Sequence, residues 1–419
     1  MTGKTAGRSL GTVGIAVLVA AGLGYPILIV TGRVLSEADA AVFLTFWGLV
    51  FGVGSTLAPV EQELSRLAAV ADVAGKRVGG TAVRTVAVAA AAVGVFGLLV
   101  LVPPVSERLF GEYSVIALVA LASGLAFAVQ FGTRGLLIGF HEAKSFGGLV
   151  VTEAAVRIVL LGLFLLLGLN GVVPLAVAVA AGSFAFLPFG LRARKHLDVA
   201  GDAEPWGVVA RRILVLMLSA GLTASVLTGY PAIVKLFATT QGELEALGGL
   251  VLALSVARVP LLLLSPVQAM AVPTVVRLSQ DEEGHGKLRA LLVKGSAGAF
   301  GLAAVGAALG WLIGPWVVQL LFGAKFDVPG WVVAGLVWSS VLLGAVMLLA
   351  AVLVARTEGG KVLVLWAVVA ALSVLVLAFA PGDLVLRAVL GLVAAPTAGA
   401  VVAMAFVLRP GVRAETSTG

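Results

Sequence analysis

The chain has 419 residues, of which 60% are hydrophobic and 12% charged, with a net charge of +7 and no cysteine. A soluble protein of this length could not cover so much apolar surface, so the composition excludes that class and predicts an all-α polytopic membrane protein. The absence of cysteine excludes disulfides and thiol chemistry. The basic residues are scattered singly through loops, which favours a role in membrane orientation over nucleic-acid binding.

Twelve apolar segments are long enough to cross a bilayer, since about 20 helical residues span the hydrocarbon core. The first has no cleavage site followed by a soluble domain, so we expect it to be retained. The second and eighth are expected to continue as helices beyond the membrane, through residues 61–69 and 274–279. The predicted spans are 9–31, 37–58, 80–102, 113–137, 146–168, 171–191, 211–236, 246–275, 290–313, 328–354, 361–380 and 382–408.

Lysine and arginine residues fall mostly on one side of these spans. With the N-terminus in the cytoplasm, 21 of the 28 lie in or near cytoplasmic segments and five lie in or near segments on the opposite side. The remaining two, Arg157 and Arg258, lie well inside spans. This bias predicts a multi-pass protein of the cytoplasmic membrane with both termini in the cytoplasm. The predicted divisions are a tail at 1–8, a six-helix lobe at 9–191, a cytoplasmic linker at 192–210, a second six-helix lobe at 211–408 and a tail at 409–419.

Three short motifs recur in the same order in the two halves. Six spans per half is an even number, so the halves point the same way and are related by a pseudo-two-fold axis along the membrane normal. Two parallel bundles of this kind are typical of a rocking transporter. The paired motifs are LSRLAAVADVAGKR at 64–77 with VVRLSQDEEGHGKL at 275–288, RLFGEY at 108–113 with LLFGAKF at 320–326, and GFHEAK at 139–144 with ARTEGGK at 355–361.

The eighth predicted span contains a charge and three helix breakers. An arginine near the middle of a span costs about 2.5–3.5 kcal/mol on insertion scales, so Arg258 is expected to face the protein interior or a watery cavity. Pro260, Pro266 and Pro273 each remove a backbone hydrogen bond and bend the helix. The pattern favours a hinged helix on the path of an anion, although an arginine that serves packing alone remains an alternative.

The fifth span contains an acid and a base four residues apart. At this spacing Glu153 and Arg157 meet on one face of a helix. The pair either neutralises itself to lower the cost of insertion, or includes a proton-responsive carboxylate whose release frees Arg157 for substrate. The first and seventh spans contain no Asp or Glu, and Arg157 and Arg258 outnumber Glu153 inside the bundle. This cationic interior favours a pyrophosphate or acidic sugar over a cationic drug.

The order of these segments resembles the polysaccharide-export branch, the O-antigen flippases, of the multidrug/oligosaccharidyl-lipid/polysaccharide (MOP) flippase superfamily. The resemblance implies two six-helix lobes around an alternating-access cavity. It also implies a polyprenyl-(pyro)phosphate-linked oligosaccharide moved from the inner to the outer leaflet for cell-surface polysaccharide biosynthesis. The residues that carry it are GRVLSEADAAVFLTFWGLVFGVGSTLAPVEQELSR at 32–66, RGLLIGFHEAKSFGGLVVTEAAVRIVL at 134–160, ARVPLLLLSPVQAMAVPTVVRLS at 257–279 and LLFGAKF at 320–326.

In this superfamily the lobe interface is lined largely by the first, second, seventh and eighth helices. The implied partners are a lipid-linked saccharide, membrane lipids, and a polysaccharide polymerase or glycosyltransferases. Glu153 and Glu61 are candidate coupling carboxylates. The residues predicted to bind the anionic headgroup are Arg258, Arg33, Arg157, Lys235 and Arg66.

No catalytic or metal site is predicted. His141, His196 and His285 lie in separate loops without carboxylate or cysteine companions. The sequence has no GxSxG motif, Walker loop or paired catalytic carboxylates, so we expect neither an enzyme nor a cofactor. Two other functions remain open, which are a MATE-like drug or small-metabolite antiporter and a non-transporting scaffold of a glycan-assembly complex.

Overall fold

The computed structural model describes residues 22–259, 261, 282–356 and 358–408, and the regular elements in these ranges are all helical. Within them, ten helices are long and apolar enough to cross a membrane. The predicted all-α, multi-pass membrane class is therefore confirmed. Much of the first predicted span and half of the eighth lie outside the described residues, so the full count of twelve stays a prediction.

The chain divides into two compact units. The first comprises Met1–Gly248 with Leu321–Gly323, and the second comprises Gly249–Leu320 with Ala324–Gly419. Helices α10 (Trp206–Leu227) and α11 (Tyr230–Phe237) thus belong to the first unit. The predicted lobe limits at 191 and 211 and the pseudo-two-fold axis stay predictions.

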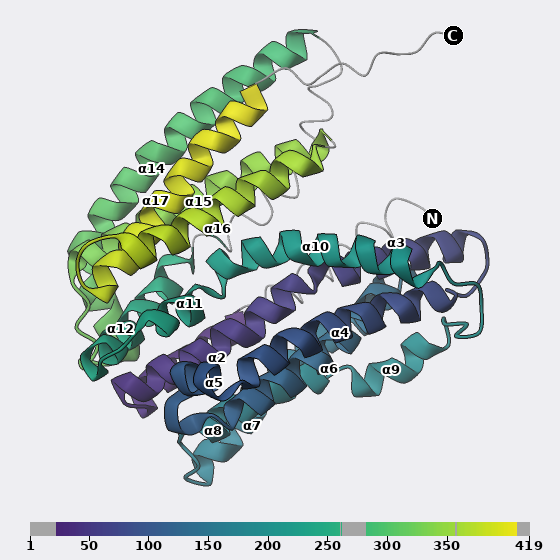
Figure 1. Cartoon of the computed structure of the whole chain (residues 1–419), viewed down its shortest axis with the longest axis horizontal. Helices are drawn as coiled ribbons and strands as arrows, with labels where there is room; N and C mark the ends of the chain where they lie inside the picture. Colours follow the sequence, from purple (N-terminus) through teal and green to yellow (C-terminus); the bar gives the residue numbers. More distant parts are fainter. Residues whose placement is uncertain (1–21, 260, 262–281, 357, 409–419) are drawn as a thin grey trace. The chain divides into compact units, whose positions relative to one another are not determined.

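The first unit is built around α6 (Ile116–Gly139), which contacts α2, α3, α4 and α8 (Figure 1). Glycines let α6 approach α3 closely. A Cβ atom at Gly135 would collide with the carbonyl oxygen of Glu61, and one at Gly139 would collide with the Cβ of Ala68. Small residues at such contacts are what close helix packing in lipid requires. The other helices of this unit are α2 (Glu37–Thr56), α3 (Ala58–Val73), α4 (Gly80–Leu101), α5 (Pro103–Phe110), α7 (Ala143–Leu166), α8 (Val172–Ala181) and α9 (Leu187–Arg194).

The second predicted span continues beyond residue 58, as expected. Helix α2 ends at Thr56 and α3 begins at Ala58, with Leu57 between them, and together they form one 37-residue candidate span from Glu37 to Val73. This continuation places Glu61 and Glu63 on an ordered helix. The corresponding extension predicted for residues 274–279 lies outside the described residues.

The second unit contains α14 (Glu282–Phe322), α15 (Gly330–Ala355), α16 (Gly359–Phe379) and α17 (Leu384–Leu408). Helix α17 packs against both α15 and α16. Helix α12 (Gln241–Ala257) begins in the first unit and enters the second at Gly249.

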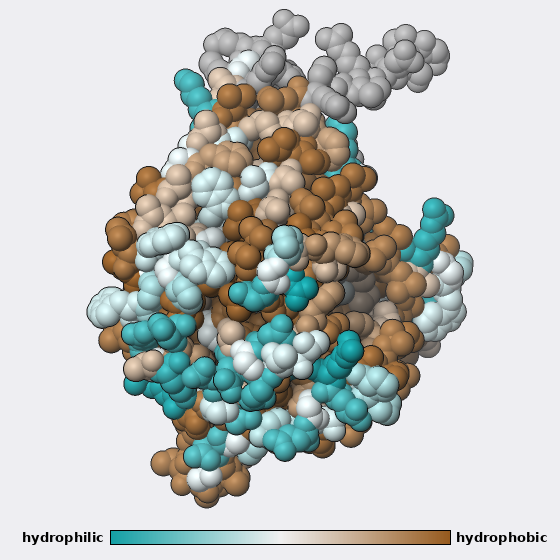
Figure 2. Space-filling view, turned by 60° about the vertical axis from the view of Figure 1, so that its left-hand side comes forward, coloured by the Kyte–Doolittle hydropathy of each residue, from teal (hydrophilic) through white to brown (hydrophobic). Residues whose placement is uncertain are grey.

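Apolar side chains are exposed over long stretches of these helices, as the brown areas of Figure 2 illustrate. On α4, Val95, Leu98 and Leu99 are each about 60% exposed. A soluble protein would not tolerate such a surface, whereas lipid chains cover it in a membrane.

Two of the repeated motifs share their backbone geometry. Gly111 and Gly323, which end the two LFG sequences, both have positive φ, at 58° and 114°. The phenylalanine before each glycine, Phe110 or Phe322, is buried. Glu142 and Glu358 cap the N-termini of α7 and α16 with nearly the same dihedral angles, φ −83° and ψ 54° against φ −92° and ψ 50°. These matches support the internal repeat at two of its three motifs.

Candidate functional site

Five polar side chains from three helices form a buried cluster in the first unit. Glu61 comes from α3, Gln130 and Arg134 from α6, and Glu153 and Arg157 from α7. Gln130, Glu153 and Arg157 are all at least 91% buried. A polar group buried in this way is costly unless it is hydrogen-bonded, so the contacts within the cluster decide what it can do.

Glu153 is the centre of this cluster. Its Oε1 accepts a hydrogen bond from Arg157 Nη2 at 2.6 Å, and its Oε2 accepts one from Gln130 Nε2 at 2.6 Å. Arg134 Nη1 lies 3.8 Å from the same Oε2. The predicted pairing of Glu153 with Arg157 is therefore confirmed, and two further donors from α6 join it.

Arg134 connects Glu153 to Glu61. Its Nε lies 3.0 Å from Glu61 Oε2, and its guanidinium lies 4.7 Å from the ring centre of Phe131 and 5.4 Å from that of Phe146. Arg134 lies near the cytoplasmic end of the predicted span 113–137, and its side chain is only 15% exposed. The sequence could have predicted this, because Gln130 and Arg134 are four residues apart and therefore lie on the same face of the helix.

The side chain of Arg157 is fixed by several contacts besides Glu153. Its Nε donates to the carbonyl oxygen of Val179 at 3.1 Å, and its guanidinium lies 4.9 Å from the ring centre of Phe51 and 5.9 Å from that of Phe127. A Cβ atom at Gly182 would lie 2.5 Å from the same Nε, so a glycine is needed there. Arg157 can reach a substrate only after Glu153 releases it.

The cluster as a whole carries no surplus charge. Two carboxylates, Glu61 and Glu153, face two guanidiniums, Arg134 and Arg157. The cationic excess predicted for the whole interior included Arg258, which lies outside this cluster, and left out Glu61 and Arg134. An anion bound at this cluster would therefore first require protonation of a carboxylate.

Lys235 is a buried cation in a different position. It lies on α11, which packs against α2 and α5, and it is 3% exposed. Within the described residues its side chain has no hydrogen bond or ion pair, in contrast to those of Arg134 and Arg157. An ammonium taken out of water without a counter-ion is strongly unfavourable, so this position suits an anionic ligand.

The other predicted binding residues lie outside the cluster. Arg33 is exposed, and its Nε donates to the carbonyl oxygen of Leu321 at 3.0 Å. Arg66 is 56% exposed and forms a two-point ion pair with Glu63. Arg258 is half-buried, directly after α12, and belongs to the second unit. The predicted hinge residues, Pro260, Pro266 and Pro273, lie outside the described residues.

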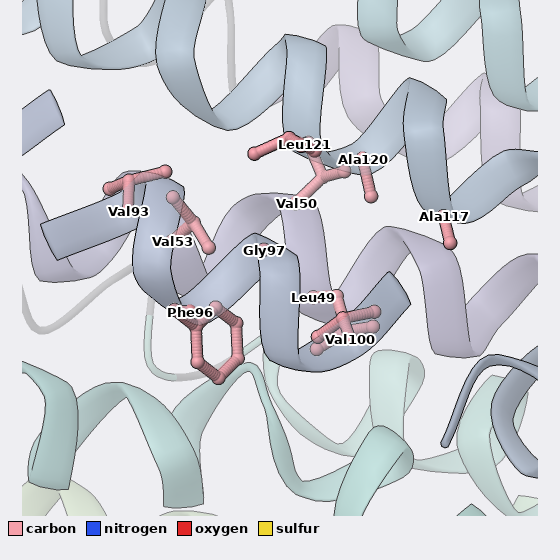
Figure 3. A pocket seen from close by; sticks show the side chains of 10 residues that line it. All are labelled: Leu49, Val50, Val53, Val93, Phe96, Gly97, Val100, Ala117, Ala120 and Leu121. Atoms are coloured by element: carbon pink, nitrogen blue, oxygen red, sulfur yellow. The ribbon is translucent and has the colours of Figure 1, made fainter. Parts of the chain in front are cut away.

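An apolar pocket of about 20 Å³ lies between α2, α4 and α6 (Figure 3). It offers no polar side chain to a ligand, so it cannot hold a phosphate or an ion. Its lining consists of Leu49, Val50, Val53, Val93, Phe96, Gly97, Val100, Ala117, Ala120 and Leu121.

Solved structures with the same arrangement of helices are transporters. A multidrug resistance MATE family transporter of the MOP superfamily, in an inward-facing conformation, matches with a TM-score of 0.65, 19% identity and coverage of 91% of this chain and 94% of that chain. The chain has the fold of MATE transporters. An outward-facing conformation of a MATE transporter matches with a TM-score of 0.60 and 19% identity over 96% of this chain and 94% of that chain. This likeness shows the fold, while a transport function and the polysaccharide-export branch stay proposals.

A third similar solved structure is described by the polarity of its binding pocket. It is a MOP superfamily transporter from Pyrococcus furiosus, for which reverse polarity of the binding pocket is said to suggest a different function. It matches with a TM-score of 0.54 and 18% identity over 96% of this chain and 95% of that chain.

Two mycobacterial proteins are similar in sequence. A protein of Mycobacterium tuberculosis is 29% identical over 420 residues, with coverage of 97% of this chain and 93% of its own length. A protein of Mycobacterium bovis is 29% identical over 369 residues, with coverage of 84% and 81%. Both are described as uncharacterized, and no family model matches the chain.

Proposed function

We propose that this transporter is a flippase that moves a polyprenyl-(pyro)phosphate-linked oligosaccharide from the inner to the outer leaflet of the cytoplasmic membrane. Alternating access of two like-oriented halves is the mechanism that the internal repeat favours. The oligosaccharide serves cell-surface polysaccharide synthesis, with a polymerase or glycosyltransferases as partners. The distribution of lysine and arginine favours cytoplasmic termini.

Lys235 is the observation that carries the choice of an anionic substrate. The residue is 3% exposed, and its ammonium lacks a counter-ion within the described residues. Each carboxylate of the buried cluster, in contrast, lies beside an arginine. A cationic drug needs an available carboxylate, whereas a phosphate needs an available cation. The charge pattern of the described interior therefore favours a phosphate.

Substitution of Lys235 by methionine tests this assignment. Met keeps the shape of the side chain and removes a buried charge, so the free energy of unfolding should stay equal or rise. A hydrogen bond to a charged group contributes about 1.5–3 kcal/mol, and each 1.4 kcal/mol is about tenfold, so transport should fall at least about tenfold. The measurement is transfer of a fluorescent polyprenyl-pyrophosphate saccharide across vesicles that contain the full chain.

Two further variants serve as controls for Lys235→Met. Lys235→Arg keeps the charge and should retain most of the transport, while Lys325→Met removes an exposed lysine and should leave it unchanged. Normal transport by a stable Lys235→Met protein would refute the role of this residue.

In this proposal, the buried cluster couples protonation to substrate binding, and Arg258 binds the headgroup. Protonation of Glu153 releases Arg157, and protonation of Glu61 releases Arg134, so that a guanidinium becomes available to phosphate. Arg258 takes the headgroup within the second half, with Arg66 on the cytoplasmic side and Arg33 on the outer side. The three prolines that follow Arg258 provide the bend of its helix.

A drug or small-metabolite antiporter is the second candidate, because two of the similar solved structures are multidrug resistance transporters. Deletion of the gene distinguishes the two functions. Lower efflux of a cationic dye with normal surface glycan supports the antiporter. Accumulation of lipid-linked precursor with normal dye efflux supports the flippase.

A further inference from the structure

Residues 195–205, between α9 and α10, lie along the residues that precede α4 and are attached to them by backbone hydrogen bonds. We name this segment the strap. Val78 N donates to the carbonyl oxygen of His196 at 2.9 Å, and Asp198 N donates to the carbonyl oxygen of Val78 at 2.8 Å. These two bonds form a parallel bridge between Val78 and Leu197. The predicted linker is thus an ordered segment.

Two glycines allow the strap to lie this close. A Cβ atom at Gly79 would collide with the carbonyl oxygen of Asp202, and one at Gly80 would lie 2.9 Å from the Cβ of Ala203. Gly80 N also donates to the carbonyl oxygen of Gly201 at 3.3 Å. The GG sequence before α4 is therefore explained by the docked strap.

Glu142 anchors the first end of the strap. Its Oε1 lies 2.8 Å from both Lys195 Nζ and His196 Nε2. The ring of His196 also stacks on that of Phe140, with 4.1 Å between their centres and 12° between their planes. Burial of the Glu142 carboxyl raises its pKa, but hydrogen bonds from Lys195, His196 and Ser145 outweigh this and lower the pKa to about 2. The strap is thus attached to the turn between α6 and α7.

Glu204 anchors the other end. It accepts two hydrogen bonds from Arg212, at 3.0 and 3.1 Å, and Arg212 Nη2 lies 3.1 Å from Glu63 Oε1 on α3. The backbone N of Glu204 donates to Thr81 Oγ1 at 2.9 Å. Arg84 donates to the carbonyl oxygen of Glu204 and lies over the ring of Trp206, 5.1 Å from its centre.

Helix α10, which follows the strap, also packs against helices of the first unit along its length. Val209, Ile213 and Met217 are buried and four residues apart, so they form one stripe on the helix. The helix contacts α2, α3 and α4, all from the first half of the chain. Its place in the first compact unit follows from this stripe.

We propose that the strap makes α10 a mechanical part of the first half, so that the linker stays docked throughout transport. The compact unit that contains the strap, α10 and α11 extends to Gly248, so the parts of the chain that move against it lie beyond α11. The first predicted span of the second half is thereby fixed to the first half at its cytoplasmic end. This inference goes beyond the proposed function and does not depend on the substrate.

A disulfide across the bridge tests the proposal, because the chain has no cysteine of its own. Adjacent bridged segments lie about 4.8 Å apart, within the Cα separation of about 4.4–6.8 Å that a disulfide accepts. The double variant Val78→Cys with Leu197→Cys is placed in vesicles, and its transport is measured before and after oxidation, with each single variant as a control. We expect oxidised and reduced proteins to transport within twofold of each other. Transport that oxidation stops and a reductant restores would overturn the proposal.

Hydrogen exchange in lipid nanodiscs gives a second measurement that needs no substrate, so failure of the flippase assignment leaves it intact. Peptides that cover residues 76–84 and 195–206 should exchange as slowly as the helix cores in the full-length chain. Glu204→Ala should speed their exchange at least tenfold. Asp202→Ala removes an exposed acid from the same segment and should leave exchange unchanged. Fast exchange of both peptides in the unsubstituted chain would contradict a docked strap.

Discussion

At the scale of single residues, the buried charges described above are of two kinds. One group, which we call the closed set, is paired internally, and the other charge has no partner of opposite sign among the described residues. Glu61, Arg134, Glu153 and Arg157 neutralise one another inside the first unit. Lys235 has no such counter-ion within the described part of the chain. In the proposed function, the closed set needs a proton before it can take an anion, whereas Lys235 needs none.

How far these contacts could be predicted depends on their separation in sequence. Glu153 and Arg157 are four residues apart, so helical geometry alone brings them together. Arg134 and Glu61 are 73 residues apart and meet only because glycines bring α6 against α3. The residue pattern within one span cannot predict a contact with another span. The sequence therefore predicted the local pair and missed the wider cluster.

The low pKa of Glu142 predicts an acid-sensitive strap. A carboxyl whose folded pKa is about 2 instead of 4.5 stabilises the folded state above pH 4.5, and this contribution is lost as the pH falls toward 2. The full effect is at most about 3 kcal/mol, because each pKa unit corresponds to about 1.4 kcal/mol. Exchange of the 195–206 peptide, corrected for intrinsic rates, should accelerate between pH 4.5 and pH 3.

Glu142→Gln provides the comparison for this pH effect. The amide cannot ionise, so this variant should show weaker protection at pH 7 and little further change on acidification. Equal pH dependence in the two proteins would remove Glu142 as the cause.

At the scale of elements, most span positions within the described residues agree with the prediction, because long apolar runs are unambiguous in a chain of this composition. The predicted span 211–236 is instead divided between α10 and α11. The continuation of α2 into α3 was also predicted. The strap was missed because its attachment is made by backbone bonds and by polar residues, such as Glu204, that in sequence resemble an ordinary solvated linker. Apolar periodicity carries no information about such contacts.

The two LFG glycines give an element-scale prediction. Gly111 and Gly323 both have positive φ, where a Cβ atom is strained, so each alanine substitution should lower stability by about 1 kcal/mol. Gly162 lies inside α7, and a Cβ atom there would meet nothing within 4 Å, so Gly162→Ala should raise stability by up to about 1 kcal/mol. Thermal unfolding of the three variants in one detergent provides the measurement. Stabilisation by Gly111→Ala would contradict the matching of the two motifs.

At the scale of the whole molecule, orientation in the membrane is the prediction with the simplest measurement. Single cysteines in a chain that has none can be labelled from outside intact cells with a charged maleimide. Arg108→Cys and Arg387→Cys should react, whereas Lys76→Cys and Lys144→Cys should react only after the membrane is opened. External labelling of Lys76→Cys would reverse the orientation, and opposite results for Arg108 and Arg387 would change the span count between them.

The attachment of α10 to α3 and α4 has a consequence for folding during synthesis. Once the ribosome has synthesised about the first 240 residues, every described contact of the strap and of the stripe on α10 already has both of its partners. Domains generally fold as units during synthesis, with the N-terminal one first. Most of the first unit can therefore assemble in the bilayer while its remaining piece, Leu321–Gly323, is still untranslated.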